Sequence, residues 1–222
     1  YFTSSEEGTQ AVAEVKVILV GEGASGKTSL TRCLRGERFN PREAMTDGIR
    51  IKPLQVETDS RDIKVNLWDF GGQEIMHATH QFFLSKRSLY VLVLDGRRDE
   101  RPEYWLRYIE SFGGDSPVLV VFNKYDTNPS FDLDRPSLQE KYPFIKGFLR
   151  TSCNTGQGIQ AFKAALIKEL DEVPMTRKQW PVCWFREKAE LEQRKDPRIT
   201  HGQSEAGCLE AGPGGKTRMD WV

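Results

Sequence analysis

The sequence predicts an α/β fold in which a mixed, mostly parallel six-stranded sheet carries helices on both faces. Short apolar runs typical of buried strands alternate with helix-like runs, which favours parallel strands joined by helices. A glycine-rich loop follows the first strand and leads into the first helix. Two successive strands, 49–56 and 63–68, are joined by a short polar turn, which predicts a hairpin and one antiparallel edge.

The individual elements follow from local patterns. Run 15–20 is apolar and β-branched enough to be a buried strand, and run 63–68 alternates apolar and polar residues as a strand does. The polar stretch 128–142 holds two prolines and is expected to be a surface loop with one short helix. The other expected elements are a helix after the glycine-rich loop, a strand at 89–94, a helix at 102–112, a strand at 118–122, a strand ending near 150 and a helix at 159–170.

At 222 residues the chain has room for one domain and an extension, on a prior of roughly 150 residues per domain. We expect a polar leader at 1–13, the α/β domain at 14–172, the start of a further segment at 173–200 and a flexible or foreign tail at 201–222. A helix expected after Pro181 is apolar around too much of its circumference for a solvent-facing element, so it packs on its own domain or on a partner. Because the chain begins with Tyr1, we expect a piece of a longer protein.

Charge and cysteine usage exclude several classes of partner. Lysine plus arginine equals aspartate plus glutamate at 32 each, so we expect no nucleic-acid partner. No apolar run approaches the roughly 18 residues of a membrane span and no signal peptide opens the chain, so we expect no direct membrane insertion. The cysteines are too scattered for a zinc site and are expected to be reduced thiols in the cytoplasm. They are Cys33, Cys153, Cys183 and Cys208.

The loop 21–28, Gly-Glu-Gly-Ala-Ser-Gly-Lys-Thr, has the Walker A spacing between a buried strand and a helix. Its glycines let backbone N–H groups face a β-phosphate at the positive end of that helix. Lys27 is predicted to bridge the β- and γ-phosphates, and the Thr28 hydroxyl to ligate Mg²⁺. The predicted phosphate-binding residues are Gly21, Gly23, Ala24, Ser25, Gly26, Lys27, Thr28 and Ser29.

The same loop also fits the G-x-G-x-x-G pattern of a Rossmann dinucleotide site. That alternative does not need the lysine and threonine that follow the last glycine, and it leaves the motifs described below unexplained. Its acidic residue should close the second strand, but Glu57 and Asp59 lie late for the usual spacing of roughly 20 residues. We therefore favour a loop that binds nucleoside triphosphate.

A second motif, Asp-Phe-Gly-Gly-Gln at 69–73, follows the alternating strand at the predicted carboxyl edge of the sheet. Asp69 is the candidate Walker B acid, which usually holds Mg²⁺ through a water. The N–H of Gly72 is predicted to contact a γ-phosphate oxygen, since no side chain obstructs it. Gln73 is predicted to orient the attacking water because its amide both donates and accepts; the alternative is an exposed polar residue after a turn.

Segment 39–48 lies between the first helix and the second strand and lacks any periodicity. A segment in this place could respond to the γ-phosphate. Thr46 is its best candidate, because the hydroxyl would complete the Mg²⁺ shell while the N–H contacts the γ-phosphate. The alternative for Thr46 is a turn or capping threonine.

The tetrapeptide Asn123-Lys124-Tyr125-Asp126 directly follows strand 118–122 and predicts which base is bound. Guanine presents two adjacent donors, N1–H and N2–H, and one carboxylate accepts both, so Asp126 favours guanine. Adenine has no such pair and would leave the charge unpaired. Asn123 and Lys124 are predicted to shape the pocket around the base.

Stretch 148–159 contains a strand end, a turn and a helix start, and we expect it behind the base. Ser152 is predicted to brace the turn, while the backbone N–H of Cys153 donates to the guanine O6. Adenine carries a donor at that position and would clash. The Cys153 side chain is predicted only to be small enough to fit.

With these residues the chain resembles the small Ras-like GTPases, and more closely the Roc domains of Roco proteins, from about residue 15 to 170. The Roc-like features are run 77–90 after the glutamine, Tyr104-Trp105, and Ser-Phe-Gly-Gly-Asp-Ser-Pro at 111–117. The chain departs from the Ras-like pattern at Gly71 and Cys153, where such chains usually carry alanine. Many Roc domains lack the glutamine, so its presence here favours hydrolysis.

The resemblance implies a Ras-like P-loop GTPase fold that binds GTP and GDP and hydrolyses GTP with Mg²⁺. It also implies a COR domain after the Roc domain, leucine-rich repeats before it in many members, and a homodimer as a candidate assembly. Segment 173–200, with Trp180-Pro181 and a charged helix, resembles the start of COR.

Two functional hypotheses stay open. The first is a guanine-nucleotide switch with slow turnover, since no motif places an internal arginine finger, which is worth roughly 10³ to 10⁵ in rate. The second is a dimerisation or docking module that nucleotide controls, with negligible turnover. A third class, an ATP-using P-loop enzyme, conflicts with Asp126.

Overall fold

The structure, a computed structural model, describes residues 9–11, 14–58, 62–71, 83–97, 101–172 and 179–181. These fall into two compact units. The larger unit holds residues 14–172, and the smaller one holds the two short segments near the chain ends. The predicted site lies entirely in the larger unit.

The larger unit contains a six-stranded sheet in the order β3-β4-β2-β5-β6-β7. All neighbouring strands are parallel except β3 and β4, so the predicted mixed, mostly parallel sheet is confirmed. The predicted hairpin at its edge is confirmed as well, with Ile49 opposite Phe70 and Glu57 opposite Asp62. In chain order the elements are β2 (Glu14–Val20), α1 (Lys27–Leu34), β3 (Ile49–Glu57), β4 (Asp62–Phe70), β5 (Ser88–Leu94), α2 (Pro102–Gly113), β6 (Val118–Phe122), α3 (Arg135–Lys141), β7 (Ile145–Arg150) and α4 (Ile159–Glu172).

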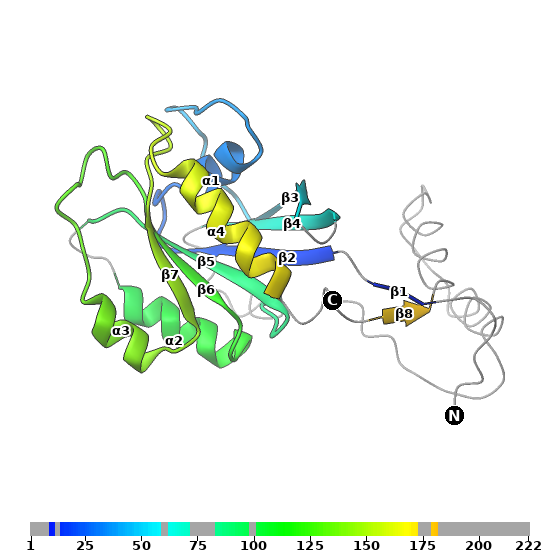
Figure 1. Ribbon diagram of the computed structural model, residues 1–222. Coiled ribbons are helices and arrows are strands. Elements are labelled where there is room, and N and C mark those ends of the chain that lie inside the picture. The colour runs from blue at the N-terminus through cyan, green and yellow to red at the C-terminus, as the bar shows by residue number, and fades with distance from the viewer. Residues whose placement is uncertain are drawn as a thin grey trace. The chain divides into compact units, whose positions relative to one another are not determined.

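Helices cover both faces of the sheet, α1 and α4 on one and α2 and α3 on the other (Figure 1). Side chains alternate between the faces along each strand, so each central strand contributes to both layers of core. In β5, Val91 packs with α1 and α4, while Tyr90 and Leu92 pack with α2. All residues of β5 and β6 are buried, which explains why their sequences are continuous apolar runs.

The parallel strands end together at one edge of the sheet, and polar residues follow there. Gly21 comes after β2, Asp95 after β5, Asn123 after β6 and Thr151 after β7, while Asp69 stands near the end of β4. Residues far apart in the sequence are thereby collected at the edge where α/β folds bind ligands.

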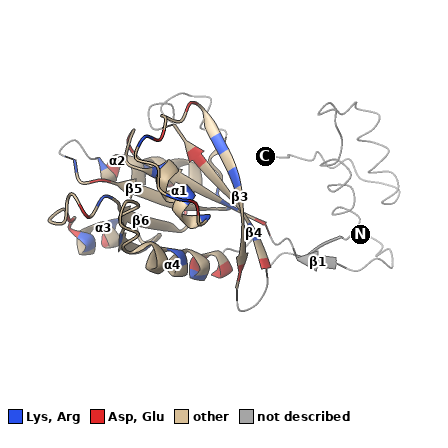
Figure 2. Ribbon diagram, turned by 90° about the horizontal axis from the view of Figure 1, so that it is seen from above, with Lys and Arg blue, Asp and Glu red and all other residues tan. Residues whose placement is uncertain are grey.

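The polar stretch between β6 and β7 contains the predicted short helix, α3. Asp134 caps it, because its Oδ1 accepts a hydrogen bond of 3.2 Å from the backbone N–H of Ser137. Proline in the first turn suits a helix start, where its missing N–H costs nothing. Acidic and basic residues are interspersed along the described ribbon, for example on α4, in keeping with the balanced composition (Figure 2).

In the smaller unit the structure describes two strands, β1 (Thr9–Ala11) and β8 (Gln179–Pro181), which pair antiparallel. The segments expected as leader and as COR start therefore contribute one strand each to a common ladder. The predicted helix after Pro181 and the predicted tail at 201–222 lie outside the described residues. Among the residues that are described, no helix has the length and apolar character needed to cross a membrane.

Two glycines in the turn before α4 provide a matched test of the packing behind the site. Gly156 and Gly158 have φ of 79° and 72°, so alanine is strained at both. A Cβ at Gly158 would lie 1.9 Å from the carbonyl oxygen of Arg150, whereas one at Gly156 meets nothing within 4 Å. We expect Gly156→Ala to lower the free energy of unfolding by about 1 kcal/mol, and Gly158→Ala by about 3 kcal/mol or more. Urea unfolding measures both, and equal losses would contradict the described turn.

Candidate functional site

The carboxyl edge of the sheet opens onto a cavity of about 550 Å³, which is within the range of small-molecule sites. Its walls come from the glycine-rich loop, from segment 39–46 and from the two loops that follow β6 and β7. The cavity therefore unites the predicted phosphate loop, the predicted responsive segment and the predicted base loops. Predicted site residues that line it are Gly23, Ala24, Gly26, Lys27, Thr28, Ser29, Thr46, Asn123, Lys124, Asp126 and Cys153.

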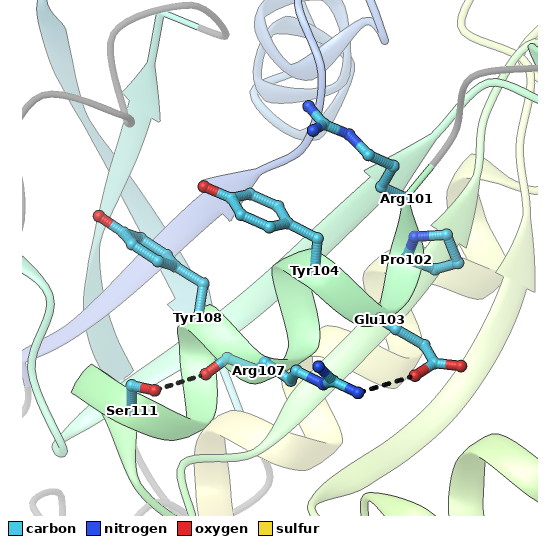
Figure 3. Close-up of a pocket in the computed structure, with 7 residues that line it drawn as sticks. All are labelled: Arg101, Pro102, Glu103, Tyr104, Arg107, Tyr108 and Ser111. Atoms are coloured by element: carbon cyan, nitrogen blue, oxygen red, sulfur yellow. Dashed lines mark hydrogen bonds and ion pairs between the residues drawn. The ribbon is translucent and has the colours of Figure 1, made fainter.

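A second hollow, of about 680 Å³, lies on the outer face of α2 (Figure 3). All its lining residues come from α2 and from Arg101 directly before it, and none is among the predicted nucleotide-, metal- or water-binding residues. Tyr104 and Tyr108 stack there with ring centroids 6.2 Å apart, and Arg101 covers the ring of Tyr104. We therefore place the functional site at the sheet edge.

The glycine-rich loop turns tightly into α1. Gly26 is the N-cap residue with φ of 95°, and no side chain caps the helix. The first turn of α1 also carries no acidic residue, so its N–H groups and positive dipole end suit an anion. Gly26 further allows a close approach, since a Cβ here would lie 2.2 Å from Nδ2 of Asn123.

Lys27 lies within the loop and is only 5% exposed. Its Nζ donates to the carbonyl oxygens of Gly21 and Glu22, both at 2.9 Å. Burial lowers the pKa of Lys27 to about 8, while the charges of Asp69 and Glu22 act in the opposite direction. A poorly solvated ammonium held beside a helix N-terminus is well placed to attract phosphate.

Three oxygen-bearing side chains converge next to Lys27. The Thr28 hydroxyl donates to Oδ2 of Asp69 at 2.6 Å, and the Thr46 hydroxyl lies 2.9 Å from that of Thr28 and 3.3 Å from the same Oδ2. Burial raises the pKa of Asp69, and the bonds from Thr28 and the charge of Lys27 oppose that rise. Three separate segments, α1, 39–48 and β4, thus meet at one point.

This cluster fits a hard divalent cation. Its donors are two hydroxyls and a carboxylate, which are ligands that Mg²⁺ prefers. Oδ1 of Asp69 is buried and has no hydrogen-bond partner among the described residues, so it can accept from a metal-bound water. Within the described part of the chain there is no group of three His, Cys, Asp or Glu side chains that could hold a metal.

Asn123 joins the base loops to the phosphate loop. Its Nδ2 donates to the carbonyl oxygen of Ser25 at 3.0 Å. Its Oδ1 accepts from the Thr151 hydroxyl at 3.3 Å and from the Cys153 thiol at 3.4 Å. All these groups are buried, so each bond prevents a desolvated polar atom from being left unpaired.

Lys124 is held by an acid that sequence reasoning missed. Asp95, which is 4% exposed, accepts from Nζ of Lys124 at 2.7 Å and from the guanidinium of Arg97 at 2.8 and 2.6 Å. Lys124 itself has φ of 56°, which a non-glycine residue rarely adopts. A signal was present, because Asp95 follows a buried strand directly, as Asn123 does.

Asp126 presents an ionised carboxylate at the mouth of the cavity. Hydrogen bonds from the Ser152 hydroxyl and then from Asn154 lower its pKa. Nδ2 of Asn154 lies 3.3 Å from Oδ2 of Asp126, and Asn154 also lines the cavity, although sequence reasoning did not select it. Ser152 braces the turn as predicted, since its Oγ accepts from the N–H of Thr155 at 3.2 Å.

The remaining predicted residues lie behind the wall or outside the described chain. Gly21, Ser25, Asp69 and Ser152 are buried and support the lining residues. Gly72 and Gln73 lie outside the described residues.

Comparisons with known proteins show which family the chain is similar to. The family model described as "Ras of Complex, Roc, domain of DAPkinase" matches residues 16–126, which is half of the 222-residue chain. A probable serine/threonine-protein kinase, roco5 of Dictyostelium discoideum, is 30% identical over 209 residues, covering 69% of this chain and 8% of that protein. A Roc-COR-CHAT protease from an unknown prokaryotic organism is 28% identical over 218 residues, covering 86% and 20%.

A solved structure is also similar, that of Methanosarcina barkeri Roco2 RocCORdC bound to GDP. It has 56% identity and a TM-score of 0.86, and the match covers 95% of this chain and 65% of that one. This chain thus spans less than two thirds of each of these relatives. With the family model matched over half of its length, and with the Ras-like P-loop fold and its motifs assembled at one sheet edge, the chain belongs to the Roc family.

Proposed function

We propose that this chain binds GTP and GDP together with Mg²⁺ and hydrolyses GTP slowly, as the regulatory GTPase module of a larger multidomain protein. The observation that carries the proposal is a single cavity lined by Lys27 and Thr28 and also by Asp126. A phosphate-binding ammonium and a base-selecting carboxylate are thus available to one ligand. The GDP bound to the similar Roco2 structure supports the same class of ligand.

The phosphates would lie against the N–H groups of the glycine-rich loop. Lys27 would then exchange its bonds to the loop carbonyls for bonds to phosphate oxygens, which a buried ammonium makes more strongly than a solvated one. Ser29 lines the cavity one residue further into α1 and would lie within reach of the phosphate closer to the base.

The Mg²⁺ ion would be held by the hydroxyls of Thr28 and Thr46 and, through a water, by Asp69. When bound, it would neutralise negative charge on the phosphates. The chain's own contribution is to bring the three side chains together before the ligand arrives, with separations of 2.6 to 3.3 Å.

The guanine would be read by Asp126 and by the loop after β7. The carboxylate would accept from N1–H and N2–H, while the N–H of Cys153 would donate to O6. Asn154 would release Asp126 as the base enters, since its bond to that carboxylate is long and exposed. Lys124, fixed by Asp95, would cover one side of the pocket.

GTP hydrolysis would depend on segment 39–48 and on the motif at 69–73. Thr46 would order segment 39–48 through its bonds to the metal site, Gly72 would contact the γ-phosphate, and Gln73 would orient the attacking water. We place the domain at 14–172 and the start of COR at 173–200. We also propose that the parent protein is cytoplasmic and carries leucine-rich repeats before the Roc domain. The proposed assembly is a homodimer.

Replacing Asp126 by asparagine tests base selection, because the preference should change from guanine to xanthine. Asparagine loses both charge-assisted bonds to guanine, so GDP affinity should fall on the order of 10³-fold. Xanthine has a carbonyl where guanine has its amino group, so the asparagine N–H can donate to it. Xanthosine diphosphate should therefore bind to the Asp126→Asn variant more tightly than to wild type. Competition titration measures both affinities.

The matched control is Asp132→Asn, an exposed aspartate of the neighbouring loop that pairs with Arg135 and Arg150 and does not line the cavity. It should leave both affinities unchanged. A GDP affinity that survives in Asp126→Asn would refute the base assignment.

Removing the metal tests the oxygen cluster. Chelation of Mg²⁺ should accelerate GDP release from wild type about tenfold or more, because phosphate charge is no longer neutralised. Thr28→Ala should release GDP at one fast rate with or without Mg²⁺. Thr31→Ala, which deletes a buried hydroxyl on the same helix, should keep the metal dependence. Fluorescent GDP analogues report the rates, and a Thr28→Ala chain that still responds to Mg²⁺ would exclude this ligand set.

Single-turnover GTP hydrolysis tests Gln73. We expect Gln73→Ala to be slower by a factor of about ten or more, because the attacking water loses its orienting amide. GTP affinity should be unchanged, and Gln139→Ala on the exposed face of α3 should match wild type. An unaltered rate in Gln73→Ala would exclude the water-positioning role of Gln73 and favour a docking module instead.

A further inference from the structure

Two cysteines that are far apart in the sequence meet behind the base loop, and the proposed function uses neither thiol. Cys33 lies on α1 and is half-buried, while Cys153 is buried in the loop after β7. Sγ of Cys33 lies 3.9 Å from the carbonyl oxygen of Cys153, and Cys33 packs against the same core cluster that contains Cys153. Both are free cysteines.

The two thiols differ as an attacking and a resolving cysteine do. The neighbouring Cys153 side chain, helped by the charge of Arg32, lowers the pKa of Cys33 to about 7, against the opposing effect of burial. The neighbouring Cys33 and burial raise the pKa of Cys153. The half-buried Cys33 thiol therefore loses its proton more readily than the buried Cys153 thiol.

Cys153 connects this pair to the nucleotide cavity. It lines the cavity, and its thiol donates to Oδ1 of Asn123 at 3.4 Å. Asn123 in turn holds the carbonyl of Ser25 in the phosphate loop. A bond from Cys153 to Cys33 would draw the sulfur away from Asn123 and shift the backbone that faces the base.

We propose that Cys33 and Cys153 form an oxidisable dithiol site, at which a hydroperoxide closes a disulfide that weakens nucleotide binding. The Cys33 thiolate attacks one peroxide oxygen, the O–O bond breaks, and Cys33 becomes a sulfenic acid while hydroxide leaves. The Cys153 sulfur then attacks the Cys33 sulfur, the S–O bond breaks, and the departing oxygen takes the Cys153 proton as water. The hydroxide takes up the proton that Cys33 had released, so two thiols and hydrogen peroxide give one disulfide and two waters. A dithiol reductant reverses the step.

The disulfide can form without a bound ligand, whereas its effect on affinity rests on the proposed function. Losing one buried hydrogen bond at Asn123 corresponds to about a tenfold change in affinity. GDP should conversely slow the oxidation, because a base held by the N–H of Cys153 fixes the loop that has to move.

The test uses the whole chain with Cys183→Ser and Cys208→Ser, so that only the pair remains. After treatment with hydrogen peroxide, non-reducing peptide mapping should show one linkage between the peptides of Cys33 and Cys153, with a mass roughly 2 Da below their sum. GDP affinity should fall about tenfold and recover with dithiothreitol. The further variant Cys33→Ser should bind GDP as the reduced chain does and should not respond to peroxide.

Absence of the linked peptide from folded, peroxide-treated protein would overturn the site. A linked peptide with unchanged GDP affinity would overturn its effect on the nucleotide. If the untreated chain fails to bind GDP, the proposed function fails, and the mapping alone still decides whether the dithiol site exists.

Discussion

The site depends on one hydrogen bond, from Nδ2 of Asn123 to the carbonyl oxygen of Ser25. It ties the end of β6 to the glycine-rich loop after β2, and Gly26 makes it sterically feasible because any Cβ there would collide with Nδ2. The other side of Asn123 accepts from Thr151 and Cys153, so the same residue also holds the loop after β7. The glycine-rich loop and the two loops that follow β6 and β7 are thereby set at a fixed spacing.

The parallel sheet lowers the conformational entropy that is lost in arranging these loops. Its strands end at a common edge and are buried on both faces, so the loops that follow start from rigid positions. The positive φ angles of Ala24 and Lys124, one in each loop, are the kind of local strain that tertiary structure sustains at functional sites. Under the proposed function, binding a nucleotide would rearrange side chains such as Lys27 and Asn154, while the cavity itself is already formed.

Sequence reasoning predicted the sheet and most of the site because their signals are local. Continuous apolar runs marked β5 and β6, and motif spacing marked Lys27, Thr28 and Asp126. It missed Asp95 and Asn154, since each acts through a partner brought close only by folding. The meeting of Cys33 with Cys153 spans 120 positions, and the three-residue strands β1 and β8 are too short to carry a periodicity.

We propose that one site reads both the base and the β-phosphate of the same nucleotide. Competition titration of the wild-type chain with GDP, ADP and GMP separates the two contributions, because ADP changes only the base and GMP lacks only the β-phosphate. GDP should bind more tightly than either by a factor on the order of 10² or more, since each omission loses charge-assisted bonds in a desolvated pocket. ADP or GMP competing within a factor of about ten of GDP would contradict it.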